Sequence, residues 1–193
     1  MSSPGGGRIL VAGIGNIFLG DDAFGIEVVR RLRDAVLPPG VDVSDYGIRG
    51  LHLAYDLLDG RPDVLVLVDA LPLEEPPGTL AVLRVDLDDP GWTLRPADVL
   101  DVPAADAHGM DPESVLRLLR SLGGGVDRVL VVGCRPAVLD ERMGLSPPVA
   151  AAVDEAVRTV AGIVREEAAR LGGAGAAGDT PAGGSERGVS THA

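Results

Sequence analysis

Two neighbouring carboxylates, Asp21 and Asp22, stand directly behind a glycine-rich turn at residues 13–20. An apolar run precedes the turn and apolar residues repeat at helical spacing after it, which predicts the order strand, turn, helix. Such a turn commonly cradles a phosphate, because free backbone N–H groups and the helix dipole favour an anion. Two carboxylates there oppose an anionic ligand and suit a cation. Either of them could instead cap the helix that follows.

Further polar residues follow other predicted strands. Asp69 closes the apolar run of residues 64–68, and a long loop further on carries Asp106 and His108. In an open α/β sheet, ligands bind beyond the carboxyl ends of the strands, so two carboxylates and an imidazole could meet at one edge. Oxygen and nitrogen ligands without thiolate suit Ni, Zn or another borderline divalent ion. The plainer alternatives are a turn at Asp69 and a solvated loop histidine at His108.

Three other residue types in the chain are chemically notable. Asn16 is the only asparagine and lies inside the glycine turn, where αL geometry is expected for it. His52 stands near the start of a short predicted helix, where we expect a surface position. Cys134 follows a predicted strand with no histidine near it in sequence, which favours a small buried residue over a nucleophile.

The elements that must position these residues alternate between apolar runs and helical patterns. This order predicts a three-layer αβα sandwich around a central, mostly parallel, five-stranded sheet. Strands are expected at residues 8–12, 41–46, 64–69, 79–85 and 128–132, and helices at residues 23–36, 51–58, 112–122 and 147–171. The second strand alternates apolar and polar residues, so we expect it near an edge of the sheet. Asp111, followed by Pro112, is expected to cap the third helix.

Composition narrows the function classes. The 193 residues carry a net charge of −12, which argues against a nucleic acid or an anionic membrane as partner. The chain has no lysine, which excludes a P-loop lysine, a Schiff-base lysine and a Ser–Lys dyad. Its single cysteine excludes an internal disulfide and a cysteine-rich metal cluster.

Length and composition also predict the organisation of the chain. No apolar run approaches the ~18 residues of a membrane span, and the first residues lack the regions of a secretory signal, so a cytoplasmic protein is expected. We expect a flexible N-terminus at residues 1–7, one α/β domain at residues 8–171, and a disordered Gly/Ala-rich tail at residues 172–193.

Taken together, these residues resemble the hydrogenase maturation proteases, the endopeptidases that process the large subunit of nickel–iron hydrogenases. The resemblance begins with the motif Gly-Ile-Gly-Asn-Ile-Phe-Leu-Gly-Asp-Asp-Ala-Phe-Gly at residues 13–25. It continues through Val68-Asp69-Ala70, the loop around His108 and two closing segments at residues 132–136 and 144–147. Residues 8–165 are covered, which is nearly the whole predicted domain.

The resemblance implies a three-layer α/β fold of phosphorylase/hydrolase-like type and a metal site made by Asp22, Asp69 and His108. It implies an aspartic-type endopeptidase that removes a C-terminal peptide from the large-subunit precursor after nickel is in place. In that picture the three ligands sense nickel presented by the precursor, and another divalent ion such as Zn could replace it. Nickel would also be a possible Lewis acid that polarises the scissile carbonyl. A monomer is expected.

One segment departs from the family pattern. Relatives tend to carry a Gly-Gly-Thr-like loop after the second strand, whereas this chain has Asp-Tyr-Gly-Ile-Arg-Gly-Leu-His at residues 45–52. Asn16, Arg49 and His52 are therefore the expected substrate-loop residues. The planar guanidinium of Arg49 would suit a carboxylate on the precursor tail.

Two alternatives remain open from the sequence. A dinucleotide-binding domain would use Gly13 and Gly15, but Phe18 stands where such a motif needs its third glycine, and Asp45 is the best available ribose-binding carboxylate. A nickel-binding maturation chaperone would use the same residues as the protease without cleaving a peptide bond.

Overall fold

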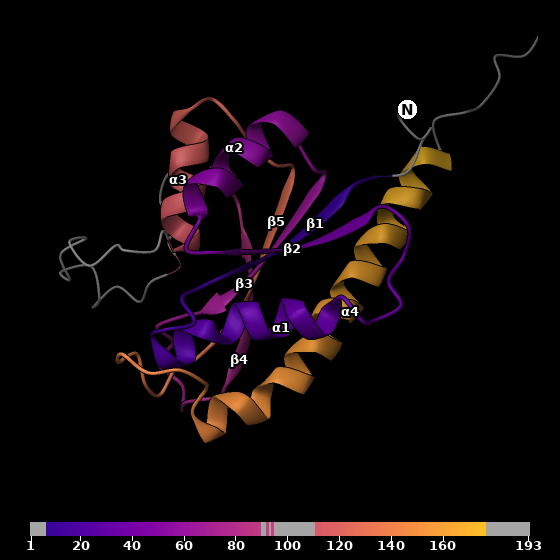
Figure 1. The fold of residues 1–193 in the computed structure, drawn as a ribbon. Helices are drawn as coiled ribbons and strands as arrows, with labels where there is room; N and C mark the ends of the chain where they lie inside the picture. Colours follow the sequence, from indigo (N-terminus) through magenta and orange to yellow (C-terminus); the bar gives the residue numbers. More distant parts are fainter. Residues whose placement is uncertain (1–6, 90–91, 93, 95–110, 177–193) are drawn as a thin grey trace, which may run out of the picture.

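The structure is a computed structural model that describes residues 7–89, 92, 94 and 111–176. Its centre is a five-stranded sheet covered by helices on both faces (Figure 1). Helices α1 (Phe24–Leu32) and α4 (Pro147–Ala176) pack together on one face, and α2 (Gly50–Gly60) and α3 (Pro112–Ser121) on the other. The predicted three-layer αβα sandwich is confirmed.

The strands are β1 (Ile9–Ile14), β2 (Val41–Gly47), β3 (Val64–Ala70), β4 (Leu80–Val85) and β5 (Arg128–Cys134). Their order across the sheet is β2-β1-β3-β5-β4. All neighbouring pairs are parallel except β4 with β5, so the sheet is mostly parallel as predicted. The expected edge position of the second strand is also confirmed, since β2 has only β1 beside it.

Along each central strand, successive side chains point to opposite faces of the sheet and so join two different parts of the core. In β3, Val64, Val66 and Val68 face α1 and α4, while Leu65 and Leu67 face α2 and α3. All five are fully buried, which explains why this strand is an uninterrupted apolar run. Among the described residues, no helix is both long enough and apolar enough to cross a bilayer.

Helix boundaries differ from the predicted ones at two places. A 3-10 turn at Gly20–Ala23 precedes α1, which ends at Leu32 and not at residue 36. Val36 is 90% exposed and lies just before Leu37 and two prolines, a sequence that disfavours helix. At the other end of the chain, α4 continues to Ala176, five residues past its predicted end. The rest of the predicted tail lies outside the described residues.

The chain order creates a switch point between β1 and β3. From β1 the chain crosses to β2 on one side, and the next strand, β3, lies on the other side of β1. Ligands of open α/β sheets bind beyond the carboxyl ends of such neighbouring strands. The turn that carries Asp22 follows β1, and Asp69 is the next-to-last residue of β3, so both carboxylates belong to this crevice.

Candidate active site

The glycines of the opening motif allow close packing of the backbone. A Cβ placed on Gly25 would lie 2.1 Å from the carbonyl oxygen of Val68 and 2.4 Å from that of Ile14. Gly15 has a φ of +136°, and a Cβ there would overlap the backbone oxygen of Asp22. These glycines therefore let the start of α1 lie directly against the ends of β1 and β3, and they place Asp22 close to the sheet.

Asn16 orders the turn in a way that differs from the prediction. Its Oδ1 accepts a hydrogen bond from the backbone N–H of Phe18 at 2.9 Å, as in an Asx turn. Its φ is not positive, because Arg61 is the one non-glycine residue with positive φ in the described parts of the chain. The expected αL geometry of Asn16 is therefore wrong, and Gly15 supplies the unusual backbone angle.

Asp21 anchors the turn to a distant loop. Its carboxylate is fully buried and accepts hydrogen bonds from the backbone N–H groups of Ala137 and Val138, both at 2.8 Å. It accepts two more from Ser146, from the backbone N–H at 2.6 Å and from Oγ at 2.8 Å. Burial alone would raise the pKa of Asp21, but these four donors outweigh it and hold the pKa below its ordinary value.

Neither of the two neighbouring carboxylates caps α1. The residue at the cap position is Ala23, and no side chain accepts a hydrogen bond at the start of either the 3-10 turn or α1. The capping alternative is therefore wrong for Asp21 and Asp22. With Asp21 committed to the distant loop, Asp22 is the carboxylate of the pair that can face a ligand.

Asp22 and Asp69 lie near each other in the crevice. Asp69 is only 3% exposed, and its Oδ1 lies 3.7 Å from the Cβ position of Gly15. Burial and then the negative charge of Asp22 raise the pKa of Asp69 well above its ordinary range. The charge of Asp111 also raises this pKa. The backbone N–H of Ala70, which donates to Oδ1 at 2.8 Å, lowers it and so partly offsets the rise. Two carboxylates in mutual repulsion favour a proton or a cation between them.

Asp22 itself is half-buried. Burial raises its pKa, and a hydrogen bond from the backbone N–H of Asn16 partly offsets that effect. Asp111 caps α3 as predicted, accepting the N–H of Ser114 at 2.7 Å. The start of α3 therefore brings a third negative charge towards Asp69.

His108 and Asp106 lie outside the described residues, so the imidazole is not placed relative to the carboxylates. Within the described ranges no three His, Cys, Asp or Glu side chains group into a metal site. The metal site of Asp22, Asp69 and His108 thus stays a prediction.

Of the predicted substrate-loop residues, Asn16 lies in the turn after β1, and Arg49 and His52 lie beyond β2. A hollow of about 410 Å³ beside the turn is lined by Asn16 and Arg49 among others, and it does not include His52. Arg49 donates from Nη2 to the carbonyl of Asp45 at 2.7 Å and from Nε to that of Tyr46 at 3.2 Å. Its guanidinium therefore supports the end of β2. His52 is exposed in the first turns of α2, as expected.

Cys134 is a buried core residue, as predicted. It is fully buried, ends β5, and its Sγ lies 3.8 Å from the carbonyl oxygen of Arg135. Burial, with a smaller effect of the Asp21 charge, raises the pKa of the thiol to about 12. A neutral buried thiol is a poor nucleophile.

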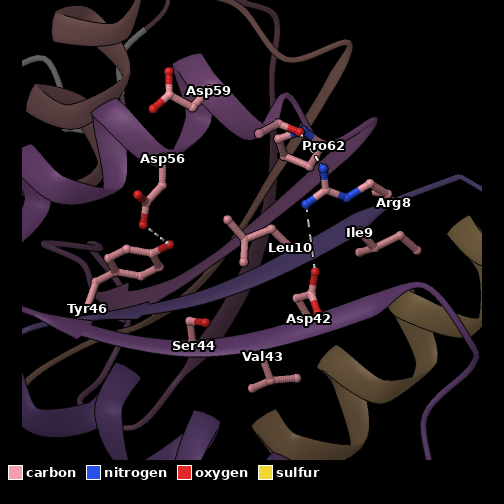
Figure 2. A pocket seen from close by; sticks show the side chains of 11 residues that line it. Arg8, Ile9, Leu10, Asp42, Val43, Ser44, Tyr46, Asp56, Asp59 and Pro62 are labelled. Atoms are coloured by element: carbon pink, nitrogen blue, oxygen red, sulfur yellow. Dashed lines mark hydrogen bonds and ion pairs between the residues drawn. The ribbon is translucent and has the colours of Figure 1, made fainter. Parts of the chain in front are cut away.

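A separate hollow of about 450 Å³ lies between β1, β2 and the end of α2 (Figure 2). Four of its polar side chains are paired: Tyr46 donates to Asp56 at 2.9 Å, and Arg8 lies 3.9 Å from Asp42. Neither Asp22 nor Asp69 lines it. This hollow is therefore distinct from the carboxylate crevice.

Comparison with known proteins identifies the family to which these sequence motifs belong. A family model described as hydrogenase maturation protease matches residues 26–163, a segment that includes Asp69 and His108 and begins after Asp22. The chain is 33% identical to a putative hydrogenase maturation protease of Methanocaldococcus jannaschii, over 82% of this chain and 97% of that protein. It is 32% identical to the hydrogenase 2 maturation protease of Escherichia coli, over 82% of this chain and 92% of that one.

Solved structures give the same result. The hydrogenase maturating endopeptidase HybD of Escherichia coli superposes with a TM-score of 0.63 at 32% identity, over 83% of this chain and 93% of that one. The [NiFe] hydrogenase maturation protease HycI of Thermococcus kodakarensis also has a TM-score of 0.63, at 27% identity, over 84% and 95% of the two chains. With the family model and both relatives in agreement, the chain belongs to the hydrogenase maturation proteases and is an endopeptidase.

Proposed function

We propose that this endopeptidase removes a C-terminal peptide from the precursor of a nickel–iron hydrogenase large subunit, and that nickel carried by the precursor is required. The observation that carries the nickel requirement is the position of Asp22 and Asp69. Asp22 lies beyond the carboxyl end of β1 and Asp69 is the next-to-last residue of β3, at the switch point of the sheet, where Asp69 is almost completely buried.

The residues present fit a divalent cation. Asp69 lies beside the like charge of Asp22, with that of Asp111 also acting on it, and a cation at this place would offset their repulsion. Carboxylate oxygens with an imidazole nitrogen form a donor set suited to nickel or zinc. In the proposal, Asp22, Asp69 and His108 hold the nickel of the precursor, which leaves coordination positions for groups of the substrate.

In this proposal the metal and the neighbouring aspartates have different roles. Bound nickel would supply a Lewis acid that polarises the scissile carbonyl. Asp22 and Asp69 orient the precursor through its metal, and Asp21 fixes the turn on which Asp22 is carried. Cys134 is buried and neutral, and we propose an aspartic-type reaction in which a carboxylate takes a proton from water as that water attacks the scissile carbonyl. We propose that the protein acts as a cytoplasmic monomer.

The two earlier alternatives do not fit an endopeptidase family. A nickel chaperone would lack cleavage, and a dinucleotide domain would need its glycines to approach a phosphate. Gly13 and Gly15 instead lie against backbone oxygens of this chain, those of Gly25 and Asp22.

Intact-mass spectrometry of a nickel-loaded large-subunit precursor tests the proposal. The unmodified protein should remove one C-terminal peptide, and the nickel-free precursor should keep its mass. Asp22→Ala, Asp69→Ala and His108→Ala should each prevent cleavage. Asp59→Ala, an exposed carboxylate on α2, and His192→Ala serve as matched controls and should cleave normally. Cleavage of the nickel-free precursor at an equal rate would overturn the nickel requirement.

A further inference from the structure

Exposed apolar side chains gather beside the turn that carries Asp22. Phe18 is 60% exposed, Leu139 53% and Met143 70%. All three line one hollow of about 780 Å³, whose remaining lining residues are Asn16, Leu19, Glu141 and Arg142. Large apolar side chains exposed together in a hollow are typical of an interaction site, whereas single exposed ones are common on any surface.

The two walls of this hollow are fixed to each other by backbone hydrogen bonds. The N–H of Gly20 donates to the carbonyl of Arg142 at 2.8 Å, and the N–H of Arg142 donates to that of Phe18 at 2.9 Å. A parallel β-bridge joins Leu19 to Arg142. Beneath them, Asp21 binds the N–H groups of Ala137 and Val138. The exposed side chains therefore stand on a fixed support, which lowers the ordering cost of binding.

The hollow is linked to Asp22 through one shared residue, Asn16. Asn16 lines it and also donates its backbone N–H to Asp22, while its side chain holds the N–H of Phe18. A polypeptide chain bound at Asp22 therefore lies beside a residue that also lines the hollow.

The charge of the hollow indicates what kind of side chain it takes. Among the described residues that line it, the two ionisable ones, Glu141 and Arg142, carry opposite charges, in a chain whose net charge is −12. Phe18, Leu139 and Met143 supply aromatic, branched and flexible apolar surface, and methionine adapts well to the shape of a partner.

We propose that this hollow binds a large apolar side chain of the substrate polypeptide close to the bond that is cleaved. The inference rests on the proposed function, because it assigns a specificity pocket to the same endopeptidase site. Its occupant is an aliphatic or aromatic residue of an extended segment of the precursor, held next to the metal-bearing end.

The test compares Phe18→Ser and the double variant Leu139→Ser/Met143→Ser with a matched control, Val82→Ser/Leu122→Ser. The control residues are 48% and 45% exposed and lie on β4 and at the end of α3. For each protein, steady-state cleavage of the nickel-loaded precursor gives kcat and KM, and biolayer interferometry with the immobilised precursor gives Kd. Thermal unfolding checks that each variant is folded.

We expect KM and Kd to rise about tenfold or more in both hollow variants, corresponding to the loss of apolar contact, with kcat within about twofold. The control should keep both constants. Unchanged KM and Kd in the hollow variants, with normal cleavage, would overturn the pocket and leave the proposed function standing. Binding that weakens in the hollow variants, while the unmodified protein never cleaves, would refute the proposed function and support the pocket. An unmodified protein that neither binds nor cleaves the precursor would refute both.

Discussion

The carboxylate of Asp21 and residue Ser146 are joined by two hydrogen bonds, across 125 positions of sequence. One comes from the backbone N–H of Ser146 at 2.6 Å and the other from its Oγ at 2.8 Å. Ser146 directly precedes α4, so this pair connects the opening turn to the start of the last helix. The position of Asp22, next along the chain, depends on that connection.

Replacing Asp21 should destabilise the protein strongly. An amide at Asp21→Asn would bring a donor NH₂ group against the donors of Ala137, Val138 and Ser146, and the buried charge that they stabilise would be lost. We expect the free energy of unfolding to fall by about 3 kcal/mol, measured by urea denaturation. Ser146→Ala removes only the Oγ donor and should cost about 1 kcal/mol. Equal stability of Asp21→Asn and the unmodified protein would contradict the anchoring role.

Asp69 should contribute to cleavage while lowering the stability of the folded protein. It is buried beside the charge of Asp22, and both effects disfavour its ionised form. Asp69→Asn keeps an acceptor for the N–H of Ala70 and removes the repulsion. We expect its melting temperature with a chelator present to rise by a few degrees, while precursor cleavage is lost.

The control for Asp69 is Asp59→Asn, which changes an exposed carboxylate on α2 and should alter neither property. A melting temperature lowered by Asp69→Asn would show that the carboxylate is stabilised by its surroundings in the folded protein, contrary to the expected repulsion.

Much of this fold could be predicted from the sequence because its signals are local. The unbroken apolar run at residues 64–68 forms most of the central strand β3, which is covered on both faces. Asp69 stands out as a carboxylate at the end of that run, and Asp111 followed by Pro112 marks the start of α3. The antiparallel direction of β4 has no such signal, because it is set by pairing with β5, more than 40 residues further along.

The role of Asp21 could not be predicted for the same reason. Its partners are mostly backbone N–H groups more than 110 positions away, and any loop residue except proline carries such a donor. The αL expectation for Asn16 failed because the neighbouring Gly15 has the positive φ. Adjacent aspartates therefore looked equivalent in sequence, whereas tertiary contacts give one an anchoring role and expose the other to the crevice.

Gly25→Ala should disrupt the packing of α1 on the sheet. Alanine favours helix over glycine by about 1 kcal/mol, but its Cβ would lie 2.1 Å from the carbonyl oxygen of Val68. Because backbone oxygens of a central strand cannot move aside cheaply, we expect a net loss of at least about 3 kcal/mol in the free energy of unfolding.

Gly162→Ala in α4 provides the matched comparison for Gly25. It is also a helical glycine, but a Cβ there meets no heavy atom within 4 Å. Helix propensity should therefore dominate, and stability should increase by up to about 1 kcal/mol. If both alanine variants were stabilised alike, close contact between α1 and the sheet would not be the reason for a glycine at position 25.

Cys134 should be dispensable for cleavage. Its thiol is fully buried and burial raises its pKa to about 12, so the native protein should not react with an aromatic disulfide reagent at pH 8. The same protein unfolded in guanidinium should titrate as one thiol, since the chain has a single cysteine. Cys134→Ala should keep kcat/KM for the precursor within about twofold, with a stability loss of about 1 kcal/mol from the smaller side chain. A folded Cys134→Ala protein that no longer cleaves would make the thiol a participant and would remove the argument for carboxylate-based chemistry.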